Sequence, residues 1–255
     1  MIPKTIHYVW LGGGKKSDMM LNCMESWKKF CPDYQITEWN EKNFDVNSHP
    51  WVKAAVEQKN WAFASDVMRA WILYHHGGIY LDTDVEILKP LDRFLEHDFF
   101  IGCESRSWCC GAIVGSVKAH PVIEKCLKRF DKECSEITMS TNLMAVHAYN
   151  AAIKILYNAV PKGKTIITDG IAMYAPDWFF PQHYLTHKIK LTENSHTIHH
   201  YASTWLTPKI KRRYKILRFA RRVFGKKIYG FFEGIVAKNI RKKLVKEMNV
   251  GATKL

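Results

Sequence analysis

The run Asp82-Thr83-Asp84 is the part of the sequence whose residue types point most directly to chemistry. Two carboxylates at positions i and i+2 of an extended segment point to opposite sides of the chain. One can therefore ligate a divalent cation while the other contacts a sugar hydroxyl or a metal-bound water. Mn²⁺ and Mg²⁺ prefer oxygen ligands and are suited to bridging the phosphates of a nucleotide. A solvated turn is the alternative interpretation of so short a motif.

A second pair of charged residues precedes this motif. Asp66 and Arg69 are three residues apart in a segment with helical periodicity, so they share one helix face. They can form an ion pair with a purely structural role. Alternatively, they direct a carboxylate and a guanidinium into a ligand pocket, where the planar fork of Arg69 would bind two oxygens of a pyrophosphate. Both interpretations stay open on the sequence alone.

The elements that must position these residues follow from the hydrophobic pattern and from glycine and proline breaks. Strands that alternate with helices indicate the α/β class, with a mostly parallel sheet flanked by helices. In such sheets a ligand binds beyond the carboxyl ends of the strands, where both Gly12-Gly13 and Asp82 fall. The pattern predicts strands over residues 6–11, 34–39, 79–81, 98–102 and 111–117, and helices over residues 18–30, 61–76, 120–134 and 141–158.

Three segments of the chain resemble glycosyltransferase family 32 and the related glucosylating domains of large clostridial toxins. The segments are "IPKTIHYVWLGG" at the N-terminus, "ASDVMRAWILYHHGGIYLDTDVEILKPL", and the closing "IHHYASTWL". They stand in the family's order and reach from the first residues to about residue 205. The resemblance implies a GT-A (Rossmann-like) fold, a nucleotide-sugar donor, a divalent metal and retention of the anomeric configuration.

The resemblance also implies a role for each matching residue. Asp84 would be the first protein ligand of Mn²⁺ or Mg²⁺, and Asp82 would reach the metal, the ribose or the sugar. Trp10 would stack on the nucleobase, with a core aromatic as the alternative interpretation. The implied catalytic set is Asp66, Arg69, Asp82 and Asp84, and the implied donor contacts are Val9, Trp10, Tyr80, Ser203 and Trp205.

The closing motif is implied to complete the metal site. Neutral imidazole is a competent ligand for Mn²⁺, and the family pattern favours His200, with His199 as the second choice. In a chain with 12 histidines, a His-His pair also occurs without any metal role. Whether Ser203 or Thr204 supplies the hydroxyl of this motif stays open. Glu104 is an acid on a presumed loop, and contact with the acceptor is one alternative for it.

The net charge of +14 is concentrated near the C-terminus. Residues 209–246 hold 15 of the 38 Lys and Arg and only one of the 24 acids, so the remainder, with 23 of each sign, is neutral. Apolar residues recur at helical spacing between these bases, which is typical of helices that lie on an anionic membrane. Packing on the catalytic domain is one alternative. Nucleic-acid binding is disfavoured, because the globule is neutral and has no recognised nucleic-acid motif.

We therefore expect a GT-A catalytic domain over residues 1–207 and a basic amphipathic helical tail over residues 208–255 that contacts the membrane through residues 209–248. No run of about 18 apolar residues and no signal-peptide core is present, so we expect a cytoplasmic protein, peripheral on the inner face of the membrane. The seven cysteines match no zinc-site spacing and are expected as reduced thiols.

The expected function is that of a metal-dependent retaining hexosyltransferase. It would move a hexosyl group from a nucleotide-sugar, with a UDP-sugar as the first expectation, to a hydroxyl of a glycan that can be lipid-linked. Capsular, exopolysaccharide or O-antigen synthesis is the expected setting. A toxin-like transferase that glycosylates proteins is one alternative. A non-catalytic basic adaptor for membranes or nucleic acids, which would need neither carboxylate, is the other.

Overall fold

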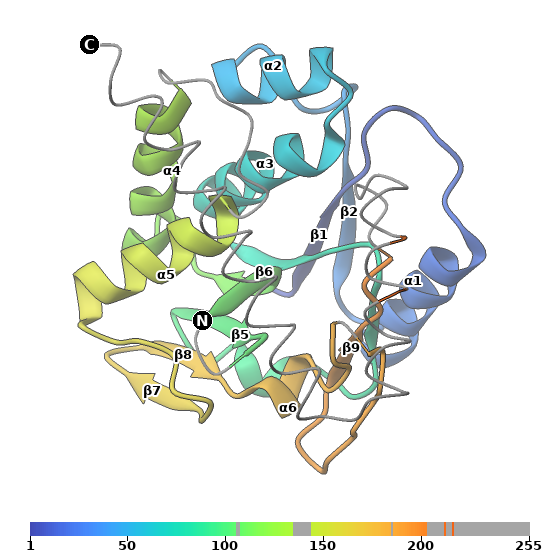
Figure 1. The fold of residues 1–255 in the computed structure, drawn as a ribbon, viewed down its shortest axis with the longest axis vertical. Coiled ribbons are helices and arrows are strands. Elements are labelled where there is room, and N and C mark those ends of the chain that lie inside the picture. The colour runs from blue at the N-terminus through green and yellow to red at the C-terminus, as the bar shows by residue number, and fades with distance from the viewer. Residues whose placement is uncertain (106–107, 135–143, 185, 203–211, 213–215, 217–255) are drawn as a thin grey trace.

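The structure is a computed structural model that describes residues 1–105, 108–134, 144–184, 186–202, 212 and 216. In this part of the chain, a seven-stranded sheet forms the centre of the molecule (Figure 1). Its strands lie in the order β2-β1-β3-β6-β5-β8-β7. They are β1 (Thr5–Val9), β2 (Gln35–Trp39), β3 (Gly78–Leu81), β5 (Phe99–Cys103), β6 (Cys109–Ser116), β7 (Ile166–Thr168) and β8 (Ile171–Tyr174).

Most strands of this sheet run in one direction. β1 is parallel to both β2 and β3, and β5 is parallel to β8. β6 lies antiparallel between β3 and β5, and the edge strand β7 is antiparallel to β8. Five strands therefore share a direction that β6 and β7 oppose, which confirms the expected mostly parallel α/β sheet.

The helices cover both faces of the sheet, and the sequence of β1 shows why. Ile6 and Tyr8 belong to one hydrophobic cluster and Val9 to the other, because alternate residues of a strand point to opposite faces. On one side Trp27 of α1 is fully buried and donates a hydrogen bond to the carbonyl of Val85 at 2.7 Å. The helices are α1 (Asp18–Phe30), α2 (Pro50–Glu57), α3 (Trp61–His76), α4 (Pro121–Cys134), α5 (Met144–Tyr157) and α6 (Pro176–Phe179), with a 3₁₀ turn at Asp92–Phe94.

Two glycines control where α3 ends and β3 begins. Gly77 has φ of +68° and Gly78 has φ of +95°, a region that side chains disfavour. A Cβ on Gly78 would lie 2.8 Å from the carbonyl oxygen of Thr5, closer than real contacts allow. Only glycine therefore lets β3 start against β1 and place Asp82 just beyond the carboxyl end of the strand.

A separate two-stranded ribbon pairs the segment that follows Asp84 with a segment that ends at His199. β4 (Val85–Ile87) pairs antiparallel with β9 (Thr197–His199), and Val85 lies opposite His199. The ribbon brings the closing histidine motif against the segment that follows the two carboxylates, beside α1 (Figure 1). The sequence predicted neither strand of the ribbon, nor α2, β7 or β8.

Several predictions from the sequence fall on residues that the structure does not describe. Ser203, Thr204 and Trp205 lie outside the described residues, and so does the basic tail over 208–255 apart from two isolated positions. The boundary between a catalytic domain and a tail therefore stays a prediction. Six cysteines are free thiols: Cys23, Cys31, Cys103, Cys109, Cys110 and Cys126. In the described part of the chain, no helix is both long and apolar enough to cross a membrane.

Candidate functional site

Asp82, Asp84 and His199 form a cluster that can hold a metal ion. Each offers one ligand atom, and the three atoms lie within 4.8 Å of one another. The two carboxylates follow β3 directly, and the histidine ends β9. Two carboxylate oxygens and one imidazole nitrogen suit Mn²⁺, and the oxygens also suit Mg²⁺.

Asp84 is the buried centre of this cluster. Its Oδ1 lies 3.2 Å from Nε2 of His199, and its Oδ2 accepts a hydrogen bond of 2.8 Å from the amide of Ala202. Burial alone would raise the pKa of Asp84, but the charge and hydrogen bond of His199 and the Ala202 amide lower it to about 2. Asp84 is therefore a carboxylate at neutral pH, as a metal ligand must be.

The second nitrogen of His199 supports a ligand at this position. Its Nδ1 is buried and has no hydrogen-bond partner among the described residues. Burial alone would lower the pKa of His199, but the charge of Asp84 outweighs burial and raises it. A buried polar nitrogen without a partner is costly unless a ligand satisfies it or the ring reorients toward one. The donor set and this nitrogen both fit a divalent cation.

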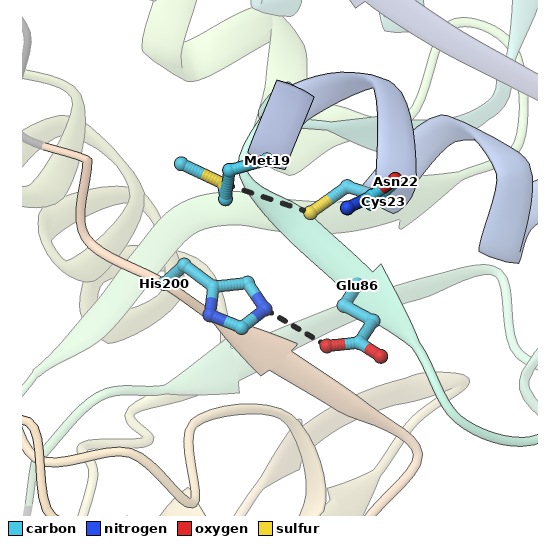
Figure 2. Close-up of a pocket in the computed structure, with 5 residues that line it drawn as sticks. All are labelled: Met19, Asn22, Cys23, Glu86 and His200. Atoms are coloured by element: carbon cyan, nitrogen blue, oxygen red, sulfur yellow. Dashed lines mark hydrogen bonds and ion pairs between the residues drawn. The ribbon is translucent and has the colours of Figure 1, made fainter. Parts of the chain in front are cut away.

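His200, the preferred histidine of the sequence analysis, points to different partners. Its Nε2 lies 2.8 Å from Oε2 of Glu86, and only its backbone amide contacts Asp84, through the carbonyl at 2.9 Å. Figure 2 shows the His200 and Glu86 side chains facing Met19 and Cys23 of α1 across a cavity of about 320 Å³. The structure thus brings His199, the second choice, to the two carboxylates.

Arg69 of α3 connects the helix to the cluster. Its Nη2 lies 3.1 Å from Asp66 and 3.2 Å from Asp82, so both alternatives for the pair apply: an ion pair within the helix and a contact with the site. Nη1 donates to the carbonyl of Gly111 at 2.8 Å, and Nε donates to the carbonyl of Ser65 at 3.3 Å. Most of its N–H donors are therefore engaged, and the guanidinium holds Asp82 in place.

The surroundings of Arg69 leave little room for movement. The guanidinium carbon lies 4.7 Å from the ring centre of Tyr80, and both side chains are buried. A Cβ on Gly111 would lie 2.9 Å from Nη1 of Arg69. Tyr80 thus supports the guanidinium through a cation–π contact within the protein core, and Gly111 provides the space that the guanidinium occupies.

Trp10 follows β1 at the same edge of the sheet. Its indole N–H donates to the carbonyl of Gly14 at 2.8 Å, and Nζ of Lys16 lies 5.0 Å from its ring centre. The side chain is half-buried, so part of the ring faces solvent. Val9, by contrast, is buried in the core cluster under α3. Stacking on a base therefore stays a prediction for Trp10, and so does a donor contact of the buried Val9.

Glu104, for which acceptor contact was one alternative in the sequence analysis, lies close to the cluster. Burial raises its pKa above the usual range, although nearby His199 and a hydrogen bond from Tyr201 oppose that shift. The ring of Tyr201 packs on His199 with 4.1 Å between centres. The β5–β6 connection carries Glu104, and only the folded sheet brings that connection to β9. The feature of the sequence that could have pointed to Glu104 is its position just after the buried strand β5.

Part of the chain is similar to known glycosyltransferases. Residues 17–101 match the family model described as "Glycosyltransferase sugar-binding region containing DXD motif". Inositol phosphoceramide mannosyltransferase 3 of Schizosaccharomyces pombe is 29% identical over 126 residues, which cover 48% of this chain and 35% of that protein. Mannosyl phosphorylinositol ceramide synthase SUR1 of Saccharomyces cerevisiae is 30% identical over 135 residues, which cover 50% of this chain and 34% of that protein.

Among solved structures, the PaToxG glycosyltransferase has a TM-score of 0.51 and 17% sequence identity, over 62% of this chain and 70% of that chain. This likeness confirms the GT-A fold. The match over residues 17–101 confirms the resemblance to glycosyltransferases that contain the DXD motif, which here is Asp82-Thr83-Asp84. This chain matches about a third of the length of the two mannosyltransferase relatives, so the activity of the whole protein is a matter for proposal.

Proposed function

We propose that this chain is a metal-dependent glycosyltransferase that moves a hexosyl group from a nucleoside diphosphate sugar to a hydroxyl group. The observation that carries the proposal is the cluster of Asp82, Asp84 and His199 within 4.8 Å at the end of β3, with Arg69 held 3.2 Å from Asp82. A divalent cation bound there would supply positive charge against the diphosphate that leaves the sugar.

The residues of the site would have different roles in this reaction. Asp84 and His199 would hold the cation, while Asp82 is oriented by Arg69 toward the cation, the ribose or the sugar. Arg69 is fixed by Asp66 and Gly111, so its positive charge stays in place when the diphosphate departs. No side chain in the described site stands out as a covalent nucleophile. We propose, as the family resemblance implies, attack on the face that the diphosphate leaves, which retains the anomeric configuration.

The donor and acceptor follow from two further observations. The half-exposed ring of Trp10 is suited to stacking on a nucleobase. The two relatives named above are mannosyltransferases whose names include a ceramide lipid. We propose mannose or another hexose as the transferred sugar and a lipid-linked acceptor, in polysaccharide or glycolipid synthesis. A membrane contact through residues 209–248 and a place at the cytoplasmic face remain predictions from the sequence.

The proposal is tested by measuring donor turnover with a panel of UDP- and GDP-sugars, with Mn²⁺, with Mg²⁺ and with a chelator. We expect turnover of at least one donor, dependent on the cation. Asp84→Asn should abolish it, because an amide is a poor ligand for the cation. Asp33→Asn, on an exposed acid paired with Lys4, is the matched control.

Two outcomes would contradict the proposal. One is turnover of no donor by folded protein with any cation. The other is an Asp84→Asn variant that keeps more than about a tenth of the activity at saturating Mn²⁺, since that loss equals only about 1.4 kcal/mol of barrier. The anomeric configuration of the product, read by nuclear magnetic resonance, tests retention separately.

A further inference from the structure

The backbone that follows β9 turns back toward Asp84. The amide of His200 donates to the carbonyl of Asp84 at 2.9 Å, and the amide of Ala202 donates to Oδ2 of the same residue at 2.8 Å. An extended strand advances about 3.3 Å per residue, so it would carry the amide of Ala202 past Asp84. The chain must therefore bend at Tyr201, which lies between the two amides.

Tyr201 makes this bend with a left-handed backbone. Its φ is +53°, a region that residues with a Cβ rarely adopt because the Cβ approaches the following carbonyl oxygen. Surrounding contacts must hold such a residue in place, and strained positions of this kind gather at ligand sites. Here the next amide along the chain, that of Ala202, is bonded to Asp84. The strained residue and the buried carboxylate are therefore directly linked.

The side chain of Tyr201 contacts the histidine of the same cluster. Its ring centre lies 4.1 Å from that of His199, with 40° between the ring planes. Phe180 contacts the same imidazole in an edge arrangement, with 5.8 Å between ring centres. Because His199 is buried and two aromatic rings pack against it, its imidazole has little freedom to turn away from Asp84.

The backbone and the ring make different demands on position 201. Glycine would adopt the left-handed conformation without strain, but it has no side chain to pack on His199. Phenylalanine would keep the ring and the strained backbone, since it lacks only the hydroxyl. A tyrosine in a conformation that favours glycine therefore points to a use for its ring. Substitution by glycine and by phenylalanine separates the ring from the backbone.

We propose that Tyr201 is a positioning residue of the cation site. Its backbone directs the amide of Ala202 to Asp84, and its ring holds the imidazole of His199 with Nε2 toward the same carboxylate. Tyr201 acts through these residues and does not itself ligate the cation. This inference deepens the proposed function, because it rests on the cation site from which that function was inferred.

The test is calorimetry of Mn²⁺ binding by the full-length, chelator-treated protein. Tyr201→Gly keeps the bend and removes the ring, so we expect binding weaker by about tenfold or more, as is typical when a group that orients a metal ligand is lost. Tyr201→Phe keeps the ring, and its affinity should stay close to that of the wild type. A Tyr201→Gly variant that binds Mn²⁺ as tightly as the wild type would overturn the proposal.

Lys59→Gly is the matched control for the change of backbone. Lys59 is exposed, has φ of +54° and lies in the turn between α2 and α3. Glycine there relieves the same kind of strain without touching the cluster, so the affinity for Mn²⁺ should be unchanged. Weaker binding in this variant as well would assign the loss to a general effect of glycine and contradict a specific role of the Tyr201 ring.

Nuclear magnetic resonance of the metal-free protein gives a second readout. An aromatic ring packed on an imidazole displaces the signals of the imidazole protons, and His199→Gln identifies those signals by their loss. We expect the displacement to persist in Tyr201→Phe and to disappear in Tyr201→Gly. A residue that only stabilises the fold would change the melting temperature and leave these signals in place, and that result would also overturn the proposal.

The outcomes keep this role apart from the proposed function. A wild type that binds Mn²⁺ but turns over no donor contradicts the function, while the two variants still decide the role of Tyr201. A wild type that turns over a donor with Mn²⁺, together with equal Mn²⁺ affinity in Tyr201→Gly, contradicts only the role of Tyr201. A folded wild type that binds no Mn²⁺ would overturn the cation site and this role together.

Discussion

Nε2 of His199 lies 3.2 Å from Oδ1 of Asp84, and this contact joins the turn after β3 to the end of β9. The adjacent His200 instead pairs with Glu86 at 2.8 Å. Neighbouring residues of identical type thus have separate partners. The difference allows the metal site to be tested one histidine at a time.

We predict that His199→Gln weakens binding of Mn²⁺ by tenfold or more, whereas His200→Gln changes it by less than about threefold. Loss of a ligand, or of a group that orients one, typically costs ten- to a hundredfold in metal affinity. Isothermal titration calorimetry of chelator-treated protein measures both constants. The reverse order would return the ligand role to His200, the choice that the family resemblance favoured.

The pKa shifts of this pair predict how pH affects the stability of the metal-free protein. The pKa of Asp84 falls from its usual 3.8 to about 2, so its contribution is present above pH 3.8 and is lost as pH falls toward 2. The pKa of His199 is raised, so its contribution is present below the usual 6.5 and is lost as pH rises through the folded value. Stability should therefore decline as pH rises above about 6.5 and through the raised pKa of His199.

Mn²⁺ should reverse this dependence at the alkaline end, because a cation replaces the proton on His199. Urea unfolding at several pH values, with Mn²⁺ and with chelator, gives both curves. His199→Gln is the control, and its metal-free stability should not decline over the same range. A wild-type decline that persists unchanged in this variant would place the titrating group elsewhere.

We predict that Gly111→Ala lowers donor turnover through its effect on Arg69. The new methyl group would lie 2.9 Å from Nη1 of Arg69, so the guanidinium must shift and loosen its hold on Asp82. Overpacking of this kind costs about 1–3 kcal/mol. Gly14→Ala is the matched control, since nothing lies within 4 Å of its Cβ. Turnover and thermal melting of both variants decide between a local shift and general unfolding.

We predict that Trp10→Ala weakens donor binding more than it slows the bound complex. Stacking of a base on an aromatic ring contributes about 1–3 kcal/mol in other nucleic-acid sites. Calorimetry with the nucleoside diphosphate measures the change, and Trp108→Ala, which removes another partly exposed tryptophan, is the control. Equal affinity in wild type and Trp10→Ala, with the fold intact, would assign Trp10 to packing alone.

Much of this site could be predicted from the sequence because its signals are local. The helices over residues 18–30 and 61–76 have the predicted bounds, since apolar periodicity and their breaks lie within the segments themselves. Gly77-Gly78 before a short apolar strand likewise positioned Asp82 and Asp84 at the end of that strand. Asp66 and Arg69 share a helix face as their spacing requires, and their ion pair follows from it.

The choice between His199 and His200 could not be made in this way. Adjacent residues have the same local sequence around them, and only the pairing of Val85 with His199 decides which imidazole meets Asp84. The contact of Arg69 with Gly111 depends likewise on β6 lying beside β3, although two strands, β4 and β5, separate them in the sequence. Residue types and local periodicity determined the elements and the two carboxylates. Strand order and register, which arise from packing between distant segments, decided which side chains complete the site.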